Sequence, residues 1–95
     1  MLKRYWFVIY PEWRYGPLNA GVTAGSLAEA KELLLKNFTK ISYAAPLERL
    51  KENDNIEIIE DIDIQLLDQD RVIPKMGPVI FKGVWFPFLN MYEEV

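Results

Sequence analysis

Leu2–Tyr10, with the sequence LKRYWFVIY, is the stretch that decides the fold. Six of its nine residues are aromatic or β-branched, and Pro11 ends the run. Such side chains favour a β-strand, where they pack against the neighbouring strands. A strand with no polar face is covered on both sides, so we expect this one in the interior of a sheet. The side chains predicted to share one face are Tyr5, Phe7 and Ile9, and those predicted on the other are Trp6, Val8 and Tyr10.

A helix over residues 27–37 is the second strong prediction. Ser26-Leu27-Ala28-Glu29 matches the capping box, in which the serine hydroxyl accepts from the amide of the third helical residue. The glutamate is then expected to accept from the serine amide. The apolar residues at helical spacing, which should face the sheet, are Leu27, Ala30, Leu34 and Phe38, with Leu33 and Leu35 beside them.

Three further stretches are predicted to be extended. Gly21–Ala24 is either a brief strand or an extended approach to the helix. Ile56–Ile64, with the sequence IEIIEDIDI, alternates, which favours one apolar and one solvated face and a bulge near Ile59-Glu60. Val79–Phe86 is the last strand, and Gly83 inside it indicates a bulge or a close backbone approach.

The remaining segments are shorter. Residues 45–53 are predicted as a short helix, and residues 39–43 as a short strand or a loop. Residues 65–74 have turn-like or single-turn helical character, with four side chains returning to the core: Leu66, Leu67, Val72 and Ile73. Together these elements predict one α+β domain over residues 1–95, with an antiparallel or mixed sheet of about three to five strands and the helix packed on one face.

The composition excludes several kinds of chemistry. Apolar residues make up 51% and charged residues 26% of the 95, as in an ordinary globular domain. The chain has no cysteine and no histidine, which removes disulfides, thiolate nucleophiles, the commonest general base and the commonest zinc ligand. No stretch approaches the roughly 20 apolar residues of a membrane span, and the N-terminal apolar run is too short for a signal peptide. We therefore expect a cytoplasmic protein that binds no membrane.

The negative charge is concentrated in one block. The net charge is −3, and residues 52–70 hold eight acidic and no basic residues. A solvated surface accounts for such a block, and so does a binding site for a basic protein partner. Nucleic acid is not expected there, because phosphate binding needs Lys and Arg. The acidic candidates for partner binding are Glu57, Asp61, Asp63, Asp68 and Asp70.

Residues 11–20 are predicted as a loop, because they hold two prolines, a glycine and an asparagine. The loop also carries Trp13, Arg14 and Tyr15, which are the residue types enriched in binding hot spots. Two interpretations stay open. Either Trp13 and Tyr15 fold back over the sheet edge as a lid on the core, or the three residues form a binding patch.

Motifs for a resident cofactor or metal are missing. Asp61, Asp63, Asp68 and Asp70 offer carboxylates for Ca²⁺ or Mg²⁺, but their spacing lacks the central glycine and terminal glutamate of an EF-hand loop. The chain has no GxGxxG and no Walker lysine motif. No serine or threonine has an evident base partner for nucleophilic catalysis. We expect no cofactor, no metal and no catalytic residue.

Four stretches together resemble a known group of proteins: KRYWFVIY, GVTAGSLAEAKELL, IEDIDIQLLD followed by RVIPKMG, and FKGVWFP. In this order, over residues 3–87, they are similar to a family of small uncharacterised bacterial proteins, loosely classed with the immunity-like proteins of toxin–immunity loci. The resemblance implies a single small α+β domain and supplies no catalytic residue.

Three functions follow as hypotheses. The first is a non-enzymatic binding protein, of the toxin-neutralising immunity kind, that acts through the acidic segment and the aromatic loop. The second is a small-ligand-binding or enzymatic domain, with a pocket between the 11–20 loop and the 83–87 strand end lined by Trp13, Arg14, Tyr15 and Trp85. The third is a homodimer formed through the exposed aromatic residues.

Overall fold

The computed structural model describes residues 2–16, 19–40 and 56–86, with residues 38–40 described by their backbone alone. Within these residues, four strands form one sheet: β1 (Lys3–Val8), β2 (Ala20–Ala24), β3 (Glu57–Glu60) and β4 (Gly83–Phe86). The helix α1 spans Leu27–Lys40, and three 3-10 helices are η1 (Pro11–Trp13), η2 (Ile64–Leu66) and η3 (Ile73–Lys75). The strand order is β3-β1-β2-β4, and every pair is antiparallel. The predicted α+β fold is confirmed.

β1 lies in the interior of the sheet, as its two apolar faces predicted. Trp6 and Phe7, which point to opposite faces, are both completely buried. The strand ends at Val8, two residues before the predicted end, because the chain bends where the amide of Ile9 donates to the carbonyl of Phe7 at 3.0 Å. Tyr10 therefore does not continue the strand and packs against the cluster on the helix side, not on the predicted Trp6 face.

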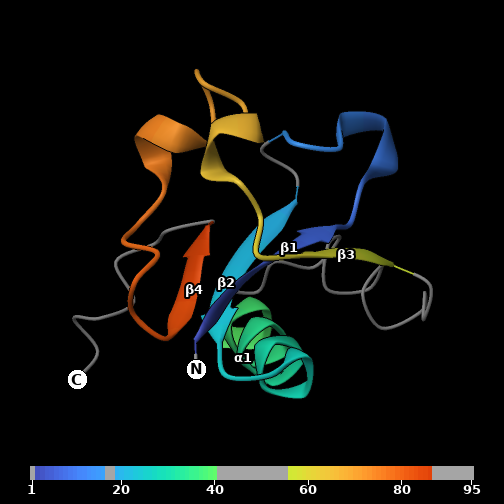
Figure 1. The fold of residues 1–95 in the computed structure, drawn as a ribbon. Coiled ribbons are helices and arrows are strands. Elements are labelled where there is room, and N and C mark those ends of the chain that lie inside the picture. The colour runs from blue at the N-terminus through green and yellow to red at the C-terminus, as the bar shows by residue number, and fades with distance from the viewer. Residues whose placement is uncertain (1, 17–18, 41–55, 87–95) are drawn as a thin grey trace.

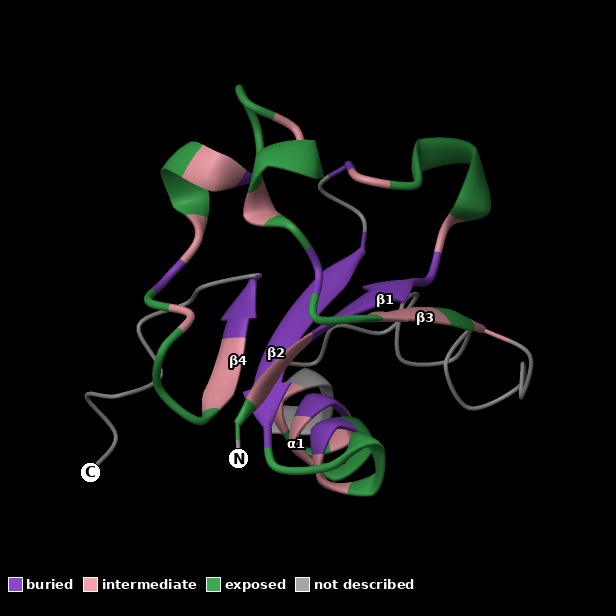
Figure 2. Cartoon of the chain, in the orientation of Figure 1, coloured by how far each residue is buried: buried purple, intermediate pink, exposed green. Residues whose placement is uncertain are grey.

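The sheet lies between two layers (Figure 1). α1 covers one face and buries Ala30 and Leu34 against side chains of β1 and β2. The irregular segment of residues 61–82, which contains η2 and η3, covers the other face. Figure 2 shows that β2 is buried along its whole length and β1 over most of it, whereas β3 is exposed at both ends. The two clusters are, on the helix side, Tyr5, Phe7, Ile9, Ala20, Val22, Ala24, Ala30 and Leu34, and on the other side, Trp6, Val8, Ile62, Leu67, Val72, Trp85 and Phe86.

The capping box at the start of α1 forms with one change of partner. The hydroxyl of Ser26 accepts from the amide of Glu29 at 3.2 Å, as predicted. The Glu29 carboxylate accepts from the amide of Gly25 at 2.7 Å, one residue before the predicted serine amide. The helix continues to Lys40, beyond the predicted end at residue 37. Leu27, predicted to face the sheet, is instead 39% exposed, and it is not part of the core cluster that α1 forms with the sheet.

β3 is much shorter than the predicted Ile56–Ile64 strand. It ends at Glu60 because Asp61 adopts a left-handed backbone conformation, with φ of 55°. The turn brings the amide of Ile62 to the carbonyl of Arg4 at 3.2 Å. The prediction of one solvated face is also wrong, because Ile58 packs on the helix side and Ile59 on the other. The chain changes direction at a turn at Asp61, and there is no bulge at Ile59-Glu60 in its pairing with β1.

The segment before β4 also departs from the prediction. The strand contains only Gly83–Phe86, and Ile80 and Phe81, predicted as strand residues, are exposed. A bulge is present, but it lies at Trp85, opposite Gly21 and Val22, and not at Gly83. It brings two consecutive side chains, Trp85 and Phe86, into the same cluster.

The segment 65–74 contains parts of η2 and of η3, as its helical-turn character predicted. Leu67 and Val72 are buried and Ile73 is half-buried, whereas Leu66, also predicted to return to the core, is 53% exposed. The predicted short helix at 45–53 and the predictions for residues 41–43 lie outside the described residues. Among the described helices, none is long and apolar enough to cross a membrane.

Candidate functional site

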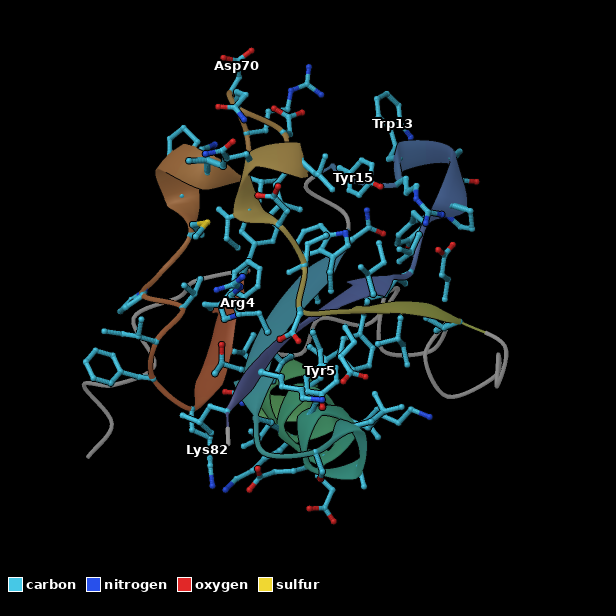
Figure 3. All side chains as sticks on the ribbon, viewed as in Figure 1. Arg4, Tyr5, Trp13, Tyr15, Asp70 and Lys82 are labelled. Atoms are coloured by element: carbon cyan, nitrogen blue, oxygen red, sulfur yellow. The ribbon has the colours of Figure 1, made fainter. Side chains whose placement is uncertain are left out.

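The two surfaces predicted separately, the aromatic loop and the acidic segment, meet in the structure. Both terminal nitrogens of the Arg14 guanidinium donate to the Glu57 carboxylate, one to each oxygen. One residue further along the loop, the carbonyl of Tyr15 accepts from the amide of Asp68 at 3.0 Å. Figure 3 shows Trp13, Tyr15 and Asp70 along the same edge of the molecule, away from α1. We call the surface formed by residues 12–15, Glu57 and residues 68–70 the acidic–aromatic edge.

Strand pairing brings these residues together. β1 and β3 are antiparallel, and Val8 at the end of β1 pairs with Glu57 at the start of β3. The loop that follows β1 therefore begins beside Glu57, and the η1 turn brings Arg14 back over it. A bidentate contact between guanidinium and carboxylate fixes the orientation of both groups.

A buried asparagine holds the backbone of the loop. Asn19 is 2% exposed. Its side-chain oxygen accepts from the amide of Tyr10 at 2.7 Å. Its side-chain nitrogen donates to the carbonyl of Trp13, and to that of Gly16 at 3.3 Å. One side chain thus ties the start, the middle and the end of the loop together.

Two hydrogen bonds within turns and one from an indole also hold the backbone of the loop. The amide of Trp13 donates to the carbonyl of Tyr10 at 2.9 Å, and the amide of Gly16 donates to the carbonyl of Trp13 at 2.8 Å. The buried indole nitrogen of Trp6 donates to the carbonyl of Arg14 at 2.8 Å. The backbone of residues 10–16 is therefore fixed from the core below it.

The side chain of Trp13 is nevertheless left in solvent. It is 54% exposed and points away from the sheet (Figure 3). Tyr15 is half-buried and packs against the cluster around Trp6. The lid interpretation therefore does not hold for Trp13, more than half of which is exposed. Tyr15 alone reaches the core.

Arg14 is the cation at the centre of the acidic–aromatic edge. The contact with Glu57, followed by a hydrogen bond to the Tyr15 hydroxyl at 3.3 Å, raises the pKa of Arg14. Its guanidinium carbon lies 5.6 Å from the centre of the Tyr15 ring, within the range of a cation–π contact. The guanidinium is thus committed to Glu57 and Tyr15.

Two of the predicted acidic residues accept hydrogen bonds from backbone amides near them in the sequence. Asp63 caps η2 by accepting from the amide of Gln65 at 3.0 Å. Asp68 accepts from the amides of Asp70 and Arg71 at 2.8 and 2.9 Å, and these bonds lower its pKa. Asp61 and Asp70 are exposed. Within the described residues, no group of three or more metal-ligating side chains is placed to hold a metal ion.

The four residues predicted to line a ligand pocket do not share one surface. Trp85 is completely buried and stacks on Trp6, with ring centres 5.8 Å apart. Arg14 turns outward to Glu57, and Trp13 is exposed beyond it. Of the three loop residues, Tyr15 alone packs against the cluster that contains Trp85.

Asn19 is the site residue that the sequence analysis did not single out. Its signal was weak: an asparagine in a loop with glycine and proline, directly before a strand. Asparagine side chains often hydrogen-bond nearby backbone in such loops. Which three backbone groups the Asn19 side chain binds, however, depends on how the loop folds.

A second exposed apolar feature lies on the other side of the molecule. Ile80 and Phe81 are 72% and 58% exposed. They are held between a hydrogen bond from the Thr23 hydroxyl to the carbonyl of Val79, at 2.6 Å, and the ion pair of Lys82 with Glu29, at 2.9 Å. The segment that carries them leads into β4, on the side opposite η1 (Figure 1).

Comparison of the chain with protein-family models, with curated proteins and with solved structures gives no match in any of the three. The candidate site therefore rests on the geometry described above.

Proposed function

We propose that the protein is a non-enzymatic binding protein of the toxin-neutralising kind, which takes a basic protein partner on the acidic–aromatic edge. The observation that carries the proposal is Trp13. A large aromatic side chain is 54% exposed on a loop whose backbone is fixed by a buried asparagine.

Such an arrangement favours binding for an energetic reason. Tryptophan is among the residues that contribute most at protein interfaces. Ordering a loop on binding costs free energy, and a loop that is already fixed avoids most of that cost. Trp13 is presented in this way, because Asn19 and the turn hydrogen bonds hold its backbone before any partner arrives.

Charge supports a basic partner. Arg14 is paired with Glu57 on the acidic–aromatic edge. The carboxylates of Asp68 and Asp70, the latter exposed, are then left as negative groups on this edge. Proteins that act on nucleic acid carry Lys and Arg on the surface that meets the phosphates. An acidic surface with an apolar anchor is complementary to such a protein and would block it.

The test begins with the genes that neighbour this one. Each neighbouring product is expressed with and without the protein, and rescue of growth identifies a toxic partner. The complex is then rebuilt from the two purified components. We expect Trp13→Ala and Glu57→Lys each to weaken binding at least about tenfold, as for central interface residues.

Phe81→Ala is the matched control, because it also removes an exposed aromatic ring but lies on the side opposite η1. It should bind like the wild type. If the rebuilt complex tolerates both Trp13→Ala and Glu57→Lys, or if no neighbouring product binds, the proposal is wrong.

A further inference from the structure

Most of the large apolar side chains that are exposed in the described part of the chain lie at one end of the sheet. Four of these six are there: Leu2, Leu27, Ile80 and Phe81. The other two, Trp13 and Leu66, belong to η1 and η2. Exposed apolar side chains that gather in one place mark an interaction surface, whereas scattered ones do not. We call the four residues the apolar end.

The register of the strands brings these residues to the same end. Lys3, the first residue of β1, pairs with Ala24, the last residue of β2. Thr23 pairs with Gly83, the first residue of β4. The start of β1, the end of β2 and the start of β4 therefore lie together (Figure 1).

Each residue of the apolar end adjoins one of these three strand ends. Leu2 precedes β1, Leu27 begins α1 just after β2, and Ile80-Phe81 precedes β4. The Lys82 ammonium lies 2.9 Å from the Glu29 carboxylate, which joins the segment before β4 to the first turn of α1. The side chains that flank this ion pair in the sequence are therefore held in place before any contact forms, which lowers the cost of binding.

The charges beside the apolar end are already compensated. Lys3 is paired with Glu60, and Lys82 is paired with Glu29. A membrane surface attracts lysines that are free to meet its anionic headgroups, and these two are not. A second copy of the chain presents the same compensated charges, so two copies can meet here without the repulsion that their net charge of −3 each would otherwise cause.

We propose that the apolar end is the contact surface of a homodimer, in which it packs on the same surface of a second copy about a twofold axis. In a twofold contact one surface supplies both halves, so a neutral apolar surface is complementary to itself. Four side chains make an interface below the roughly 1,200 Å² of stable complexes, so we expect a weak dimer that dissociates on dilution. Figure 3 shows Lys82 at the end of the molecule opposite Trp13 and Tyr15, which leaves the acidic–aromatic edge open in the dimer.

Sedimentation equilibrium tests the proposal between about 10 µM and 1 mM, the range in which so small an interface dissociates. The average mass of the wild type should rise from one chain towards two. Ile80→Asp should stay monomeric throughout, because it would bury an unpaired carboxylate in the contact. Phe81→Ala should weaken the dimer about tenfold.

Two variants make the same changes outside the apolar end. Leu66→Asp is the matched control for Ile80→Asp, and Trp13→Ala is the matched control for Phe81→Ala, since both residues are exposed and belong to η2 and η1. Both controls should dimerise like the wild type. In amide NMR spectra over the same concentrations, the shifts that change with dilution should be those of the apolar end and not those of residues 12–15.

A wild type that stays monomeric up to about 1 mM would overturn the proposal. So would a dimer that both Ile80→Asp and Phe81→Ala leave intact. Binding of a monomeric wild type to vesicles of phosphatidylcholine and phosphatidylserine, lost in Phe81→Ala, would assign the apolar end to a membrane instead. The proposed function is tested by Trp13→Ala and Glu57→Lys in the partner complex, so either proposal can fail while the other stands.

Discussion

The six-membered ring of Trp85 occupies the space in which a side chain at Gly21 would begin. A Cβ at Gly21 would overlap three carbons of that ring. The two residues meet because the bulge in β4 leaves Trp85 without a partner in β2 and directs it onto the sheet face beside Trp6. The second core cluster is therefore built around a glycine in a central strand.

Gly21→Ala should destabilise the protein by at least about 2 kcal/mol, since the added methyl group can be accommodated only by moving a completely buried ring. In an open strand position the same change would favour the folded state by a few tenths to about 1 kcal/mol. Urea unfolding measures the difference. Gly25→Ala is the control, because its Cβ would meet only the flexible Glu29 carboxylate, at 3.3 Å. Equal stability of Gly21→Ala and the wild type would contradict the packing described.

The two stacked tryptophans should respond differently to substitution by phenylalanine. Both are completely buried, but the Trp6 indole nitrogen donates to the carbonyl of Arg14, whereas that of Trp85 has no partner within the described residues. Both changes remove the same atoms. Trp6→Phe also removes a hydrogen bond, and Trp85→Phe removes an unsatisfied donor, so we expect Trp6→Phe to cost about 1–2 kcal/mol more in the free energy of unfolding. A larger loss in Trp85→Phe would show that its nitrogen is satisfied.

Acid should lower the stability of the fold by protonating two carboxylates that accept hydrogen bonds from backbone amides. The pKa of Glu29 lies below its ordinary value of 4.5, because its carboxylate accepts from the amide of Gly25 and pairs with Lys82. The pKa of Asp68 lies below 3.8, because it accepts from the amides of Asp70 and Arg71. A carboxylate with a lowered folded pKa stabilises the fold above its unfolded pKa, and this contribution is lost as pH falls through the folded value.

The melting temperature of the wild type should therefore fall more steeply between pH 5 and pH 2 than that of the Glu29→Gln/Asp68→Asn double variant. The amide side chains can still accept from the backbone but do not titrate. At pH 7 the double variant should be the less stable of the two, and the difference should narrow in acid. Parallel curves over this range would show that the two carboxylates do not couple folding to pH.

The opening strand and the helix cap were predictable because each is encoded locally. LKRYWFVIY has two apolar faces, which only an interior strand can bury, and Ser26 and Glu29 stand at the spacing of a capping box. The ends of the elements were less predictable. β3 stops where Asp61 turns so that Ile62 can bind the carbonyl of Arg4, a partner 58 residues away in the sequence.

The composition of the candidate site was predictable, but its assembly was not. Hot-spot residue types mark the loop, and eight acidic residues mark the segment 52–70. That Arg14 would bind Glu57 depends on β3 pairing with β1 from Val8 onward, and local sequence does not specify which strands become neighbours. The exposure of Trp13 likewise depends on how Asn19 closes the loop beneath it.

Asn19→Ala tests whether the loop must be fixed for Trp13 to bind a partner. The change leaves the amide of Tyr10 and the carbonyls of Trp13 and Gly16 without their side-chain partner beneath the loop, so we expect a loss of roughly 1–3 kcal/mol in the free energy of unfolding. Asn37→Ala is the matched control. Its half-buried side-chain amide donates to the carbonyl of Leu33 at 2.8 Å and lies on α1, away from the site.

The same variant should weaken the complex with the partner protein although every residue of the acidic–aromatic edge is kept, because the loop must then be ordered at the moment of binding. Hydrogen exchange at the amide of Tyr10 should accelerate in Asn19→Ala and not in Asn37→Ala, since that amide donates to the Asn19 side chain. Unchanged affinity together with faster exchange would mean that the order of the loop does not contribute to binding. Unchanged exchange would mean that Asn19 does not hold the loop at all.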